Sequence, residues 1–268
     1  MKCLIPSISP EQCKGVRFDV ATELPRVVPM RLEQFLAALL LVSGVTGCVS
    51  TDVPRPTPPA PSCFREMCPA PPSVERYYLL LFTSQHTFKV PRYTHTWATV
   101  VRVTEPGPNR PFQMATHTIS WLPASLRIRS WDLGVETGLN LDLRRTLEDI
   151  RAQGMRVSLW GPYEIDPAMY CHFLAQQAFL ESGRVGYQGL DVVGEAAIAR
   201  NGMNCVHAVA GSDARCGNPV WRIGDASGEY ISEHLIEYGA VINADCSHDW
   251  LITALGLSDY PVVRCKGR

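Results

Sequence analysis

The chain has 268 residues, of which 46% are hydrophobic and 19% are charged, and its formal net charge is −1. This is the composition of an ordinary globular protein, with room for one large domain or two small ones. No block of lysine and arginine is present, which argues against nucleic-acid binding through a basic patch.

An export signal is predicted near the N-terminus, over residues 30–47. It begins with Met30 and Arg31, continues through an apolar run from Phe35 to Val42, and ends in small residues. That order is typical of a secretory signal, and the run is too short to span a bilayer. Residues 45–48 (VTGC) resemble a bacterial lipobox, which implies that Cys48 carries a lipid anchor. A buried hydrophobic helix is the alternative.

The regions on either side of the signal are expected to be unstructured or absent. Residues 1–29 show no clear pattern, and we expect them to be an upstream extension included by a misassigned start codon. Residues 48–75 are rich in Pro, Thr, Ser and Ala, which predicts a disordered tether to a domain of residues 76–268. Val49 after the lipobox cysteine resembles outer-membrane sorting. We therefore expect a location on the periplasmic face of the outer membrane.

The first part of the domain predicts an antiparallel meander. Tyr77–Thr83 is an apolar run suited to a buried strand, and Thr94–Thr104 is rich in β-branched residues. Gln113–Leu122 follows a short turn and should pair with the second strand, while Leu126–Trp131 is a candidate fourth strand.

Helices dominate the rest of the domain. The predicted helices cover Leu141–Gln153, Asp166 to about Ser182, Cys205–Ala210, part of Asp225–Tyr238, and His248–Leu255 with Ser247 as its cap. Met155–Trp160 reads as a short strand between the first two helices. Because sheet and helices occur in separate runs, the sequence predicts an α+β domain, an antiparallel sheet packed with helices.

Cys205 is the candidate nucleophile. Asn204 is a good helix N-cap, which would place Cys205 in the first turn of a helix. There the unpaired N–H groups and the helix dipole favour the thiolate, which can attack a carbonyl if a histidine reaches it. The alternative is a buried cysteine that is inert or disulfide-bonded, since free cysteines are among the most buried residue types. A disulfide with Cys216 would abolish the catalytic role.

Two histidines on neighbouring predicted strands could serve that thiol. If the strands pair, His95 and His117 can lie side by side on one face, one as the base and one orienting it. Parity assigns His95, Trp97, Thr99 and Val101 to one face of their strand, and Ala115, His117 and Ile119 to one face of the next. Either histidine is alternatively a structural side chain.

A family resemblance connects these residues. Residues 204–209 (NCVHAV) resemble the Asn-Cys-Glu-His-Phe-Val signature of the lecithin–retinol acyltransferase family, within the circularly permuted NlpC-type papain-like thiol hydrolases. In that group a base histidine precedes a Trp-Ala pair on a strand, a second histidine follows on the next strand, and the cysteine comes last on a helix. The resemblance covers about residues 77–212 and implies Cys205 as nucleophile, His95 as general base and His117 as orienting residue. Val206 and Ala208 depart from the signature.

Together with the lipobox, the resemblance implies a membrane-anchored, permuted papain-like cysteine hydrolase or acyltransferase that acts on amide or ester bonds, with cell-wall peptides or lipids as substrates. Tyr187, Trp97 and Asn204 are expected beside the substrate. Paired CxxC and HExxH motifs are lacking, so we expect no metal and no cofactor. The alternative is a non-catalytic envelope lipoprotein that uses the same fold for binding or scaffolding.

Two further features complete the sequence-based expectations. His117–Pro123 (HTISWLP) and Trp160–Tyr163 (WGPY) resemble runs in exported bacterial proteins of an uncharacterised family, a likeness that implies no activity. The pairing of Cys171, Cys216, Cys246 and Cys265 stays open, although an exported chain permits disulfides.

Overall fold

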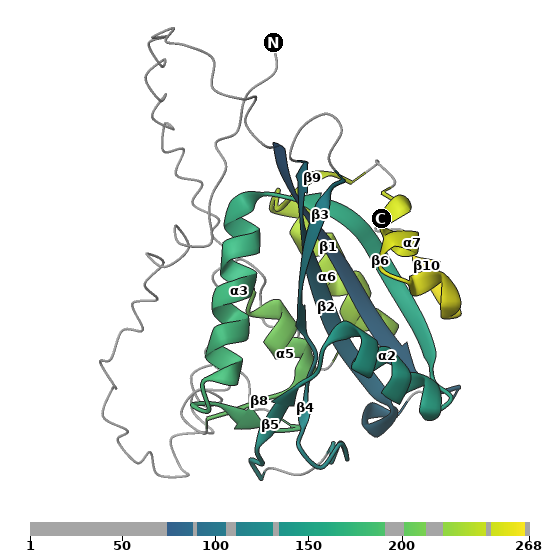
Figure 1. The fold of residues 1–268 in the computed structure, drawn as a ribbon. Helices are drawn as coiled ribbons and strands as arrows, with labels where there is room; N and C mark the ends of the chain where they lie inside the picture. Colours follow the sequence, from purple (N-terminus) through teal and green to yellow (C-terminus); the bar gives the residue numbers. More distant parts are fainter. Residues whose placement is uncertain are drawn as a thin grey trace, which may run out of the picture. The chain divides into compact units, whose positions relative to one another are not determined.

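The computed structural model describes seven stretches of the chain: residues 74–87, 90–105, 111–130, 134–190, 201–212, 222–244 and 248–265. They form a six-stranded sheet with helices on both of its faces, together with two small two-stranded sheets (Figure 1). The predicted signal, Cys48, most of the predicted tether, Cys216 and Cys246 lie outside the described residues.

The sheet is built around β1 (Val74–Gln85). Its strand order is β10–β6–β1–β2–β3, and β9 also pairs with β6. The other strands are β2 (Thr94–Glu105), β3 (Gln113–Ile119), β6 (Arg156–Ile165), β9 (Val241–Asn243) and β10 (Val262–Cys265). Every pairing in it is antiparallel except that of β10 with β6, which is parallel. The predicted meander is therefore confirmed, with β6 added on its open side.

Two hydrophobic cores lie on the two faces of this sheet. Because successive strand residues point to opposite faces, Leu79 and Leu81 of β1 enter one core and Leu80 and Phe82 enter the other. All four side chains are buried, which explains why β1 reads as a continuous apolar run rather than an alternating one.

The helices divide between the two faces. One face carries α3 (Pro167–Glu181), α5 (Cys205–Ala210) and α6 (Asp225–Glu237), and the other carries α2 (Leu143–Ala152) and α7 (Trp250–Ala254). We call these the α5 face and the α2 face. Two short 3₁₀ helices, η2 (Pro91–Tyr93) and η3 (Leu257–Asp259), precede β2 and β10. None of the helices in the described stretches has the length and apolarity needed to cross a membrane.

Side-chain caps set the starts of α2 and α3. Asp142 accepts from the backbone N–H of Arg145 at α2, and Asp166 accepts from that of Met169 at α3, where Pro167 takes the first helical position. Both caps satisfy N–H groups that the helix itself leaves unpaired. These two helices therefore begin within two residues of their predicted starts.

Two small strand pairs flank the α5 face. β4 (Trp121–Pro123) pairs with β5 (Gly138–Asn140), and β7 (Gly186–Tyr187) pairs with β8 (Gly202–Met203). The prediction of a fourth strand over Leu126–Trp131 was wrong, because residues 126–130 form no strand. The last helix is shorter than predicted, its expected cap Ser247 lies outside the described residues, and Asp249 at its start makes no side-chain cap. The predicted α+β class is confirmed.

The Trp160–Tyr163 run is an integral part of β6 rather than a loop. It sits at a register shift where β6 passes Leu79 and Leu81 of β1. Gly161 has φ +86°, and a Cβ there would lie 2.8 Å from the carbonyl oxygen of Leu79. Glycine is needed at this point because only a residue without a side chain fits both the backbone angle and the space.

Candidate functional site

Cys205 occupies the position predicted for it. It is the first residue of α5, and the Asn204 side chain caps the helix by accepting a hydrogen bond from the backbone N–H of His207 at 2.9 Å. Cys205 forms no disulfide, so it is not joined to Cys216, and it is 6% exposed. A sulfur at this end of a helix lies where the backbone dipoles favour negative charge.

His95 is buried on the α2 face of the sheet. Its ring stacks on Trp97 at 5.4 Å between centroids, and Trp97 stacks on Phe82 at 5.2 Å. Trp97 and Phe82 belong to the core beneath α2. Nε2 of His95 lies 2.9 Å from Oγ of Ser120, and Nδ1 has no hydrogen-bond partner. Complete burial lowers the pKa of His95 to about 3, so its imidazole is neutral at physiological pH.

Cys205 and His95 therefore lie on opposite sides of the sheet. The core that contains Cys205 takes Ala98 and Val100 from β2, whereas Trp97 and Val101 enter the other core. His95 shares the parity of Trp97 and points away from α5. Thr96, the next residue along β2, points toward the α5 face instead. Its Oγ1 lies 2.7 Å from Oγ of Ser227 on α6.

His117 does not lie beside His95. The β2–β3 register pairs His117 with Val100, so His117 points to the α5 face. Its ring meets Tyr170 of α3 edge-on at 6.1 Å, and burial together with the nearby Arg102 lowers the pKa of His117. The expectation that the two imidazoles share one face was wrong. A register that differs by one residue moves a side chain to the other face.

Trp97, Asn204 and Tyr187, which were expected together beside a substrate, lie apart from one another in the structure. Trp97 is completely buried beneath α2, and the side chain of Asn204 caps α5. Tyr187 of β7 lines a small pocket. Its backbone exchanges two hydrogen bonds with Glu136, at 2.7 and 3.0 Å, which joins residues 134–137 to the β7–β8 pair just before Cys205.

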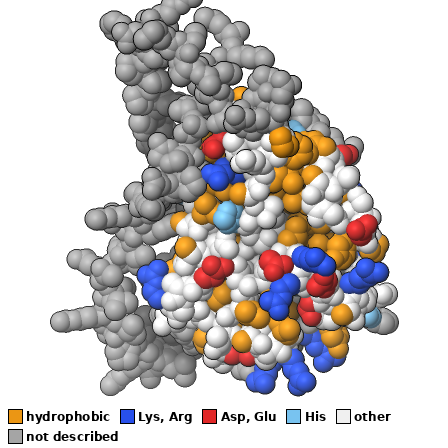
Figure 2. All heavy atoms as spheres, in the orientation of Figure 1, with side chains coloured by type: hydrophobic (Ala, Val, Ile, Leu, Met, Phe, Trp, Pro, Cys, Tyr) orange, Lys and Arg blue, Asp and Glu red, His pale blue; other side chains and the backbone are white. Residues whose placement is uncertain are grey.

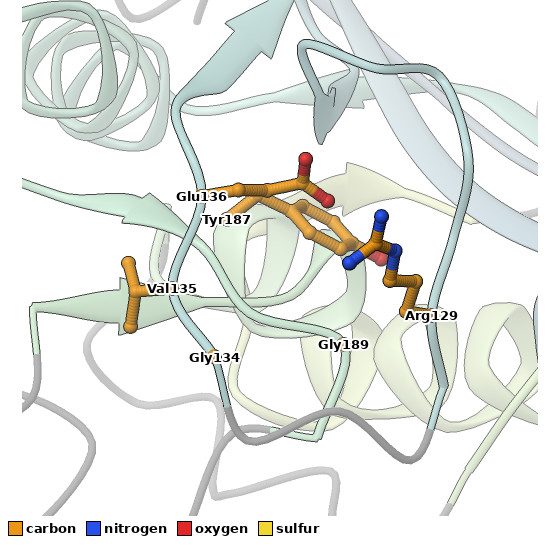
Figure 3. Close-up of a pocket in the computed structure, with 6 residues that line it drawn as sticks. All are labelled: Arg129, Gly134, Val135, Glu136, Tyr187 and Gly189. Carbon is orange, nitrogen blue, oxygen red and sulfur yellow. The ribbon is translucent and has the colours of Figure 1, made fainter.

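This pocket has a volume of about 120 Å³ and contains charged groups of both signs. Figure 3 shows the Arg129 guanidinium and the Glu136 carboxylate converging over the ring of Tyr187. Oγ of Ser125 donates to Glu136 at 3.0 Å, which orients the carboxylate. The remaining lining residues are Gly134, Val135 and Gly189.

A larger groove adjoins the pocket. Its volume is about 690 Å³, and it shares Val135 and Glu136 with the pocket. Its walls are the β5 segment on one side and the end of α3 with β7 on the other, and they include Trp121, Asn140, Glu181 and Arg184. The sequence carries no motif for this surface, because its walls come from loops about fifty residues apart in the chain.

Metal binding and a second reactive thiol have little support in the described part of the chain. No group of three His, Cys, Asp or Glu side chains there could hold a metal ion. Cys171 is disulfide-bonded. Cys265 is a free thiol whose pKa is raised, first by burial and then by Asp225, which disfavours a reactive thiolate.

Comparison with known proteins identifies no relative. No family model, no curated protein and no solved structure matches the chain. The likeness to papain-like thiol hydrolases therefore stays a hypothesis that rests on the motifs around His95, His117 and Cys205.

Proposed function

We propose that the chain is a lipid-anchored envelope protein whose folded domain binds its ligand without cleaving it. The observation that carries this proposal is the position of His95, on the face of the sheet opposite Cys205. A papain-like base has to reach the sulfur and take its proton. His95 is instead neutral, stacked on Trp97 and close to Ser120, which is the environment of a structural histidine.

The location belongs to the same proposal. Cys48 ends a signal-like run and would carry the acyl chains that hold the protein on the periplasmic face of the outer membrane. The test is fractionation of cells that express the wild type or Cys48→Ser, with mass spectrometry of the mature N-terminus. We expect the wild type in the membrane fraction with a lipidated cysteine, and the variant in the soluble fraction. An unmodified wild-type N-terminus would refute the anchor.

The pocket beside Tyr187 and its adjoining groove are the binding site that we propose. Cell-wall peptides carry free carboxylates and amines, which match the Arg129 guanidinium and the Glu136 carboxylate in charge. Charge-assisted hydrogen bonds of this kind give specificity when they are partly shielded from water.

Calorimetric titration with a cell-wall peptide tests the assignment. We expect Glu136→Gln to weaken binding about tenfold, which corresponds to about 1.4 kcal/mol. Glu148→Gln is the matched control, because Glu148 is exposed on α2, away from the pocket, and forms an ion pair with Arg144 in its own helix. Equal affinities for the two variants would place the ligand elsewhere.

A cysteine hydrolase or acyltransferase is the second candidate. Cys205 favours it, because a thiol that forms no disulfide and lies at the capped start of a helix has the position of an activated nucleophile. The thiolate would attack an amide or ester carbonyl, the leaving amine or alcohol would take a proton, and water or an amine would resolve the acyl-enzyme. Among the proposed bases, His117 lies on the face that α5 covers.

Thiol labelling separates the two candidates. Folded, reduced protein is treated with an electrophilic probe near neutral pH, and labelling of Cys205 is compared among the wild type, His95→Ala and His117→Ala. Strong labelling that either histidine variant abolishes would support the enzyme. A silent Cys205 in protein that labels readily after unfolding would support the binding role.

A further inference from the structure

Exposed apolar side chains gather at one end of the domain. Figure 1 shows that β1 and β3 both start at this end and that β9 lies there as well. Phe112, Met114 and Trp250 are 50%, 36% and 40% exposed, and Val74 at the start of β1 is 47% exposed. We call these four residues the aromatic end. Figure 2 shows hydrophobic side chains gathered on the upper part of the surface in the same view.

The rings at this end form a connected, ordered set. Phe112 meets Trp250 edge-on at 5.5 Å, and Trp250 meets Tyr78 edge-on at 5.8 Å. Tyr78 is 2% exposed, and the His248 ring also packs against it, at 4.9 Å between centroids. Trp250 is therefore held by a buried aromatic base while its own ring stays open to the surroundings. Side chains fixed in this way lose little conformational entropy when they bind a surface.

Charges beside the rings are largely paired. Asp249, next to Trp250, forms an ion pair with Arg264 at 2.9 Å. His248 lies 4.0 Å from Glu164, and Arg76 hydrogen-bonds Tyr78. In the described part of the chain, these pairs leave no uncompensated carboxylate directly beside Trp250.

The position of Val74 connects this end to the proposed anchor. Val74 begins β1 and follows Cys48 by 26 residues (74 − 48). A chain of that length spans about 30 Å as a flexible coil and about 80 Å as an extended polyproline helix. If Cys48 is anchored, the end of the domain that carries Val74 stays within that distance of the bilayer.

We propose that the aromatic end rests on the membrane surface, with Trp250 and Phe112 in the headgroup region. This inference rests on the lipid anchor proposed above. Tryptophan rings are favoured at membrane interfaces because they combine an apolar body with a polar N–H. The tether makes the contact intramolecular, so a patch of four side chains with weak intrinsic affinity is sufficient. The domain then has a fixed orientation, with the Tyr187 pocket on its far side from the start of β1.

Tryptophan fluorescence tests the contact. The mature chain from residue 48 is bound to vesicles of phosphatidylethanolamine and phosphatidylglycerol, with or without brominated acyl chains that quench tryptophan. Since the chain contains six tryptophans, quenching of Trp250 alone removes about one-sixth of the emission. We expect that loss in the wild type, its disappearance in Trp250→Phe, and a smaller loss in Phe112→Ala. Tyr93→Ala is the control, because Tyr93 is 39% exposed and precedes β2, at the other end of the sheet.

The experiment is run with two kinds of attachment so that the anchor and the contact are judged separately. One sample is lipidated at Cys48, and the other carries Cys48→Ser with an N-terminal histidine tag held by nickel-chelating lipid. Quenching in the tagged sample supports the contact even if lipidation at Cys48 fails. Vesicle-bound protein without quenching overturns the proposal. So does Trp250 emission that responds to soluble cell-wall saccharides and not to brominated lipid.

Discussion

Burial of His95 should make the folded domain sensitive to mild acid. The pKa of His95 falls from 6.5 to about 3 because its ring is completely buried. The folded state therefore keeps a neutral imidazole, whereas the unfolded chain takes up a proton below pH 6.5. Between these two values the unfolded state binds more protons, so the free energy of unfolding falls as the pH falls. From pH 7 to pH 5 this loss is about 2 kcal/mol.

Urea unfolding of the wild type and His95→Gln at pH 7 and pH 5 measures this effect. Glutamine keeps a polar group next to Ser120 but does not titrate. We expect the wild type to lose about 2 kcal/mol more than the variant between the two pH values. Only this difference reports on His95, because burial also lowers the pKa of His117. Equal losses would refute a neutral, buried imidazole at position 95.

Three further predictions concern stability and are measured by urea unfolding at pH 7. Asn204→Ala removes the cap of α5 and should cost about 1 kcal/mol, whereas Asn204→Asp keeps an acceptor and should cost less; equal losses would contradict the cap. Gly161→Ala should cost at least 1 kcal/mol more than Gly154→Ala. Both glycines have positive φ, but only at Gly161 would a Cβ meet backbone atoms; similar costs would refute the steric argument. Leu81→Ala should cost about 2–5 kcal/mol because the side chain is completely buried, and a cost below 1 kcal/mol would place it outside the core.

Local chemistry made parts of the fold predictable. The apolar run in β1 and the β-branched residues in β2 mark buried strands, and the short connection from β2 to β3 favours the antiparallel pairing that these strands form. Asp166 with Pro167, and Asn204 before Cys205, mark helix starts because capping depends on a few neighbouring residues. These elements need no information from distant parts of the chain.

The short strands were missed because distant partners stabilise them. β9 has three residues and pairs with β6, nearly eighty residues earlier in the chain. β10 has four residues and pairs with β6 about one hundred residues earlier. β7 and β8 have two residues each and form only because their segments meet. Nothing in a window of two to four residues separates such segments from loops.

The arrangement of the candidate site depended on register, which composition does not specify. His95 and His117 lie on neighbouring strands as predicted, but the pairing of Val100 with His117 puts them on opposite faces. A register shifted by one residue, which would put both histidines on one face, is equally compatible with the alternation of residues in each strand. Arg129 and Glu136 gave no signal, because Glu136 meets Tyr187 through a bridge between segments about fifty residues apart and Arg129 is linked to them only as a lining residue of the same pocket.

The position of β1 at the centre of the sheet also has a consequence for how the chain folds. β1 meets β2 across a connection of eight residues, but its other neighbour, β6, begins seventy residues after β1 ends, and β10 follows every other described strand. Local pairs close quickly and long loops close slowly. We therefore expect the β1–β2–β3 pairs to form first, while the opposite edge of β1 stays unpaired until β6 has been synthesised and the outer edge of β6 waits for β10. That side of the sheet is therefore completed only after Cys265, at the end of β10, has been synthesised.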